Sequence, residues 1–124
     1  MAGNPKFGKR IRELREAKMK DDASFSLRKF AERVGISATF LSRVETGEFD
    51  PPKADKIIKM AELLGVNQDE LLALANKIDP ELGGIIQKEP KAMADFLRTA
   101  REKGLTAEDI EKLRDEVAGG REKP

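Results

Sequence analysis

The stretch VGISATFLSRVETGEFDPP, residues 34–52, decides the fold. Gly35 suits the left-handed residue that ends a helix, because glycine adopts that conformation without strain. Ser37 suits the N-cap of the next helix, which we predict to run to about Glu45. The outward face of this helix carries short side chains and one long arginine: Ala38, Thr39, Ser42 and Arg43. A surface helix usually presents several long charged side chains, so this face is predicted to lie close against another molecule.

Two helices are predicted before this stretch. Apolar residues recur at helical spacing over 7–18, namely Phe7, Ile11 and Leu14. The basic residues between them are predicted to form an outer face: Lys9, Arg10, Arg12, Arg15 and Lys18. The polar residues 20–24 are predicted to form a loop. Ser26 is a plausible N-cap for a second helix to Val34, whose inward face carries Leu27, Phe30, Ala31 and Val34.

Two further helices are predicted after the double proline at 51–52, which prevents helix formation there. One spans about 53–64, with core residues Ile57, Met60, Ala61 and Leu64. The next begins at the capping-box pattern of Asn67 to Glu70 and buries Leu71, Leu72 and Ala75.

The pattern changes after Asn76. Asp79-Pro80 is predicted to start a helix that Gly83-Gly84 interrupts. A helix from Pro90 to Gly104 and another from Thr106 carry apolar faces, which include Met93, Phe96, Leu97, Ile110, Leu113 and Val117. Residues 119–124 are predicted to be a disordered tail. No segment has the alternating pattern of a strand, so the predicted fold class is all-α.

Composition argues against an enzyme and against a metal site. The 124 residues include no Cys, which excludes disulfides and thiolate ligands, and no His, the commonest general base and metal ligand. The acidic pairs and the Gly83-Gly84 step lack the context of a catalytic cleft or a phosphate loop. We predict no catalytic residue, no metal and no cofactor. Neither a membrane-spanning run nor a secretory signal is present, so the expected compartment is the cytoplasm.

The formal net charge of +1 conceals an uneven distribution of charge. Residues 1–43 hold 11 Lys and Arg against 5 Asp and Glu, whereas residues 44–76 hold 3 against 7. The remaining residues, 77–124, hold 10 against 11. A basic N-terminal third is typical of a localised phosphate-binding face, although solvated helix surfaces can produce the same balance.

Two helices joined by a tight turn containing glycine describe a helix-turn-helix. The run LRKFAERVGISATFLSRVETGEFDPP resembles the helix-turn-helix of the Cro/C1 repressor class, the XRE family. Ala31 and Gly35 are four apart, the apolar and serine rhythm ends at Glu45, and Gly47 and a proline follow. The resemblance extends over residues 7–75 and implies a five-helix, lambda repressor-like DNA-binding domain followed by a C-terminal helical extension.

The resemblance implies which residues meet DNA. Base contacts fall to Ala38, Thr39, Ser42 and Arg43, and Arg43 is the best candidate for direct readout because arginine pairs with guanine. Phosphate contacts fall to Ser26, Arg28, Ser37 and Thr46. The chain departs from the family pattern at Leu27, where glutamine is common. Glu48 and Asp50 would repel phosphate unless they face away, and the loop at residues 21–22 is longer than usual.

The sequence therefore predicts a cytoplasmic transcriptional regulator, a dimeric repressor that binds a palindromic operator through a recognition helix at about 37–46. Residues 1–76 would form the DNA-binding domain and 77–118 a dimerisation or partner segment. The interface candidates are Met93, Phe96, Leu97, Ile110, Leu113 and Val117. Two alternatives remain: an antitoxin or protease-released repressor whose C-terminal helices bind a toxin or peptidase, and an adaptor that never touches DNA.

Overall fold

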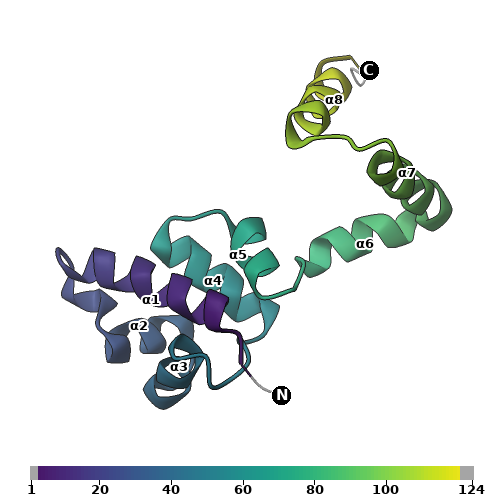
Figure 1. Cartoon of the computed structure of the whole chain (residues 1–124). Coiled ribbons are helices and arrows are strands. Elements are labelled where there is room, and N and C mark those ends of the chain that lie inside the picture. The colour runs from purple at the N-terminus through teal and green to yellow at the C-terminus, as the bar shows by residue number, and fades with distance from the viewer. Residues whose placement is uncertain (1–2, 121–124) are drawn as a thin grey trace. The chain divides into compact units, whose positions relative to one another are not determined.

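The computed structural model describes residues 3–120, and within that range the chain is helical without any strand, as predicted (Figure 1). The α-helices are α1 (Pro5–Met19), α2 (Leu27–Val34), α3 (Ala38–Glu45), α4 (Ala54–Leu64), α5 (Gln68–Leu74), α6 (Pro80–Lys88), α7 (Pro90–Glu102) and α8 (Ala107–Gly120). The chain divides into two compact units; the first ends at Leu82 and the second begins at Gly83.

Helices α1 to α5 surround one apolar core. Helix α1 packs against α3, α2 packs against α3, and α4 packs against α5. The largest side chains that are fully buried come from all five helices: Phe7, Phe30, Ile11, Leu41, Ile57, Met60, Leu72 and Val44. The predicted inward residues of α4 and α5 are all in this core. The helical spacing of apolar residues therefore identified the buried face of each of these helices.

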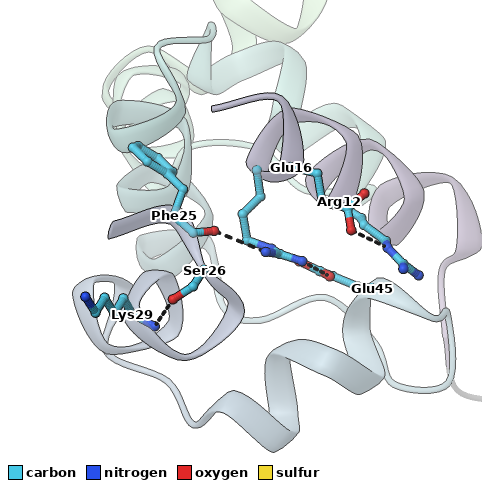
Figure 2. Close-up of polar contacts among 7 residues, drawn as sticks. Arg12, Glu16, Phe25, Ser26, Lys29 and Glu45 are labelled. Carbon is cyan, nitrogen blue, oxygen red and sulfur yellow. Dashed lines mark hydrogen bonds and ion pairs between the residues drawn. The ribbon is translucent and has the colours of Figure 1, made fainter. Parts of the chain in front are cut away.

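The turn that joins α2 and α3 forms as predicted. The Ser26 hydroxyl accepts a hydrogen bond from the backbone N–H of Lys29 at 3.3 Å, which caps α2 (Figure 2). Gly35 ends that helix with φ of 91°, in the left-handed region. The Ser37 hydroxyl then accepts from the N–H of Phe40 at 3.0 Å and caps α3. Two capped helices and one glycine thus fix the angle at which α3 leaves α2.

Helix α1 approaches α3 closely at Gly8. This glycine is buried, and a Cβ atom built on it would collide with the carbonyl oxygen of Val44. The two backbones can therefore lie together only because residue 8 has no side chain. The approach places the end of α3 against α1.

Arg15 is buried, which corrects the prediction that it belongs to the basic outer face of α1. Its side chain pairs with Glu45 through two short bonds, Nε to Oε2 at 2.7 Å and Nη2 to Oε1 at 2.9 Å. Its Nη1 donates to the carbonyl oxygen of Phe25 at 3.1 Å, and Figure 2 shows the contacts at Glu45 and Phe25. The hydrogen bonds to Glu45 raise the pKa of Arg15 above its ordinary value, against the opposing effect of burial. The pair joins α1, α3 and the segment before α2.

The segment between α1 and α2 is more ordered than the predicted loop. A short 3-10 helix occupies Ala23–Phe25, and Phe25 is buried in the core. Asp22 caps it by accepting hydrogen bonds from the hydroxyl and the backbone N–H of Ser24, and these bonds lower the pKa of Asp22. The polar residues of this segment predicted a loop, but the buried side chain of Phe25 attaches the segment to the core.

Helix α6 continues through Gly83 and Gly84, which corrects the predicted interruption. It starts with Asp79, whose Oδ1 accepts from the N–H of Glu81 at 2.9 Å, and runs to Lys88, just before Pro90. Open space surrounds both glycines. Glycine costs a helix interior only about 1 kcal/mol relative to alanine, so it weakens the helix without ending it. The break comes from Pro90, which cannot continue a helix behind it.

The last two helices begin as predicted, but α8 extends further than expected. Thr106 and Asp109 form a complete capping box, with bonds of 3.0 and 3.1 Å between each side chain and the other backbone N–H. Helix α8 includes Gly119 and Gly120, which were predicted to be part of a disordered tail. Residues 121–124, the rest of that predicted tail, lie outside the described residues.

Candidate nucleic-acid interface

The core sets the orientation of α3. Leu41 and Val44 are buried against the other helices, and Glu45 is held by Arg15. These inward residues leave the opposite side of the helix exposed, where Thr39 and Arg43 lie in solvent. Packing and a buried ion pair therefore decide which face of α3 a ligand can reach.

A hollow of about 400 Å³ lies on this exposed side. Its lining includes every predicted base-contact residue together with two others: Leu27, Ala38, Thr39, Ser42, Arg43 and Glu48. The structure thus brings the four predicted residues onto one surface. Leu27, at the start of α2, lines one side of the hollow with an apolar side chain, at the position where the family pattern commonly has glutamine.

Arg43 is held by the loop that follows α3. Its Nη1 donates to Glu48 Oε1 at 3.2 Å, and its guanidinium carbon lies 5.5 Å from the centre of the Phe49 ring. The Thr46 hydroxyl lies 2.9 Å from the other oxygen of Glu48. Phe49 is itself supported by Phe40, with ring centres 6.0 Å apart. The long side chain of Arg43 therefore has two partners in the loop at the edge of the hollow.

The predicted phosphate contacts lie at the starts of α2 and α3 and at the end of α3. The hydroxyls of Ser26 and Ser37 accept cap bonds, so each can still donate its own proton to an anion. Arg28 is exposed and pairs with Glu32 at 3.4 Å, a weak interaction at that exposure. Thr46 already bonds to Glu48, so it is the least available of the four.

Both acidic residues after α3 are bonded within the protein. Glu48 contacts Arg43 and Thr46, and Asp50 Oδ1 accepts from the N–H of Gly3 at 2.8 Å. The carboxylates thus have local donors that offset part of their charge. Both carboxylates remain exposed, so the predicted repulsion of phosphate at these two positions stays a prediction.

Sequence reasoning missed the contacts that Glu48 and Phe49 make with Arg43, and it missed the buried Arg15–Glu45 pair. Glu48 lies five residues after Arg43, beyond the end of α3, so no helical spacing relates the two residues. Arg15 did carry a signal, because Phe7, Ile11 and Arg15 are spaced by four and share one helix face. A charge on the buried face of a helix indicates a buried partner.

The apolar faces of the C-terminal helices line a second hollow, within the second unit. It has a volume of about 440 Å³ and lies between α7 and α8. Five of the six predicted interface residues line it: Phe96, Leu97, Ile110, Leu113 and Val117. Met93 is half-buried and is not part of this lining. No residue assigned to α6, α7 or α8 is buried.

Three further exposed apolar residues, which were not among the predicted interface residues, come before this hollow in the sequence. Leu82 and Ile85 lie on α6, and Ile78 comes just before it. The predicted interruption at Gly83-Gly84 left a helical segment too short to show helical spacing, so these residues were not recognised as one exposed apolar face.

Residues 3–120 contain no cluster of three acidic, histidine or cysteine residues that could hold a metal ion. In the same range, no helix is long and apolar enough to cross a membrane.

Comparison with known proteins identifies the family of the N-terminal unit. Residues 6–74 match the family model of a helix-turn-helix domain. An uncharacterized HTH-type transcriptional regulator of Bacillus subtilis (strain 168), RghRB, is 35% identical over 72 residues. That alignment covers 58% of this chain and 48% of the relative, so the chain matches about half of the relative's length. No solved structure gives a significant match.

Proposed function

Because the chain belongs to the helix-turn-helix domain family, we propose that it is a sequence-specific DNA-binding transcriptional regulator that places α3 in the major groove. The hollow on α3 carries this proposal, because the four side chains that the family resemblance assigns to base contact line it together. The protein would then act by binding DNA, and no catalytic step is assigned to it.

The shape of this face suits the major groove, which is about 12 Å wide and admits one helix. Ala38, Thr39 and Ser42 are short, so the α3 backbone can approach base edges. Arg43 alone is long enough to reach deeper, and its planar guanidinium matches the two acceptors of guanine. Ala38 and Thr39 each offer a methyl group that suits the thymine methyl.

Phosphate contacts would orient the helix in the groove. The Ser37 hydroxyl lies at the N-terminus of α3, where the helix dipole favours an anion. Ser26 and Arg28 occupy the corresponding end of α2, and Thr46 would contribute only by giving up its bond to Glu48. The excess of six positive charges over residues 1–43 would draw this surface toward DNA.

We assign DNA contact to residues 1–76 and self-association to residues 77–118, so that a dimer binds a palindromic operator and represses. The lack of buried residues in α6, α7 and α8 supports a binding partner for these helices. A second copy fits this surface because residues 77–124 carry 10 positive and 11 negative charges and would not repel themselves. A toxin or peptidase bound to the same groove is the competing occupant.

Selection from a random DNA pool tests the proposal. The full chain should enrich duplexes that share a motif, in two inverted copies about one helical turn apart. Its log affinity should fall with log salt by about 0.9 for each phosphate neutralised. Failure to enrich any motif, with affinity independent of salt, would rule out a DNA-binding role.

A further inference from the structure

We propose that Glu48 is a specificity-determining residue, which holds Arg43 on the recognition surface so that Arg43 meets a base edge and not a phosphate of unrelated DNA. The proposal rests on the proposed function, because it assumes that the α3 face binds DNA. Its evidence is separate, however: it comes from the contacts of the loop that follows α3.

The loop holds Arg43 from two sides. Glu48 Oε1 accepts from Nη1 at 3.2 Å, and the Phe49 ring lies against the guanidinium. Thr46 fixes the second carboxylate oxygen, at 2.9 Å. Phe49 in turn rests on Phe40 from α3. The contacts that hold Arg43 therefore come from α3 itself and from residues 46–49, which follow it.

The bond to Glu48 leaves Arg43 able to read a base. Guanidinium carries five N–H donors, and the contact with Glu48 uses Nη1. The donors on Nη2 and Nε remain for the two acceptors on the major-groove edge of guanine. Arg43 can therefore form a bidentate base contact while it stays attached to the protein.

The same bond makes Arg43 a poor partner for a phosphate. A phosphate is attracted by positive charge, and the ion pair of Arg43 and Glu48 has no net charge. The Glu48 carboxylate would also repel a phosphate that approached from the open side. Both groups are about half-exposed, at 48% and 57%, so the pair competes with solvent and ions and is not locked. Unrelated DNA, which offers mainly phosphates, loses more from this arrangement than a cognate site does.

The chain provides a matched control. Glu48→Gln removes one charge and keeps the shape of the side chain. Asp50→Asn makes the same change two residues away, at a carboxylate that contacts the N–H of Gly3 and not Arg43. Both positions are exposed, so the variants should fold, and circular dichroism checks this. Glu48→Ala removes the bond to Arg43 altogether.

Affinities are measured for a selected cognate duplex and for a random-sequence duplex of equal length, over a range of salt concentrations. Glu48→Gln should leave the charge of Arg43 without its counter-ion, so that Arg43 can contact one more phosphate on the random duplex and the salt slope steepens by about 0.9 relative to Asp50→Asn. That extra slope corresponds to about 3.5-fold between about 50 and about 200 mM salt. The ratio of cognate to random affinity should fall, and Glu48→Ala should lower it at least as far. In an Arg43→Ala background, the effect of Glu48→Gln should disappear.

Three results would overturn the proposal. Equal effects of Glu48→Gln and Asp50→Asn would mean that general charge, and not the restraint on Arg43, sets the affinity. An effect that persists without Arg43 would mean the same. A loss confined to the cognate duplex would make Glu48 a base contact in its own right. A wild-type chain that binds neither duplex would instead refute DNA binding itself, which is a distinguishable outcome.

Discussion

Arg43 and Arg28 are both exposed arginines in the helix-turn-helix, but their surroundings differ. Arg43 lines the hollow on α3, whereas Arg28 lies on α2 beside Glu32. We therefore expect Arg43→Ala to cost about 1–3 kcal/mol at the cognate site and to relax the preference at one base pair. Arg28→Ala should weaken binding to cognate and random DNA alike. Binding assays on both duplexes separate the two roles, and equal losses for Arg43→Ala would remove it from base readout.

The buried pair of Arg15 and Glu45 should contribute far more to stability than any exposed pair. Glu45→Gln leaves the Arg15 charge buried without its counter-ion, so we expect a loss of about 3–5 kcal/mol in the free energy of unfolding. Glu16→Gln is the control, because its pair with Arg12 is half-exposed and should contribute less than about 1 kcal/mol. Urea denaturation measures both. Similar losses in the two variants would contradict the assigned role of burial.

The individual residues of the site were partly predictable. Spacing and cap chemistry are local, so the buried faces, the caps at Ser26 and Ser37 and the left-handed Gly35 could be derived from the sequence. The pairing of Arg15 with Glu45 could not, because the two residues are 30 positions apart and meet only after α1 and α3 have packed. The contact between Glu48 and Arg43 could not be predicted for a related reason, since it depends on the backbone turn at Gly47, where φ is 82°.

At the scale of elements, two glycines have opposite meanings. Gly8 permits the contact between α1 and α3, so Gly8→Ala should force the helices apart and cost about 1–3 kcal/mol. Gly84 lies in α6 with open space around it, and Gly84→Ala should strengthen that helix by about 0.5–1 kcal/mol. Thermal unfolding followed by circular dichroism measures the first change, and the helix signal measures the second. A tolerated Gly8→Ala would argue against the close approach of the two helices.

The helix starts were easier to predict than the helix ends. N-cap residues such as Ser37, Asn67 and Thr106 indicate where a helix begins, because their side-chain oxygens accept hydrogen bonds from the first unpaired backbone N–H groups of the helix. Glycine is ambiguous: Gly35 and Gly104 end helices with positive φ, whereas Gly83 and Gly119 continue them. Sequence alone does not distinguish these cases, since the difference is whether the backbone finds further helical partners.

At the scale of the whole molecule, the two units have different sources of stability. Among residues 3–120, every buried residue lies in the first unit, which contains the core of α1 to α5. The second exposes large apolar side chains, with Phe96 56% and Val117 69% exposed. Exposed apolar residues gathered in one groove indicate a surface that another molecule covers. This contrast supports the assignment of association to the C-terminal helices.

The proposed dimer leads to the last prediction. Burying an apolar side chain fully contributes about 1.5–3 kcal/mol. Five large apolar side chains that are exposed in the single chain line the groove between α7 and α8, and a dimer would bury those of both chains. Their combined burial can exceed the entropic cost of joining two chains, which is of order 4–15 kcal/mol. We therefore expect the full chain to be a dimer and Phe96→Asp to be a folded monomer, because a buried carboxylate without a partner is costly. The monomer should bind its operator much more weakly, since tethering two half-sites adds affinity.

Sedimentation at micromolar concentration measures the oligomeric state. A chain ending at Leu82 provides the second variant, because it retains the bond of 2.8 Å between Gln68 and Asp79. If that shortened chain remained a dimer, the interface would belong to the first unit, and the groove on the second would be left for a different protein.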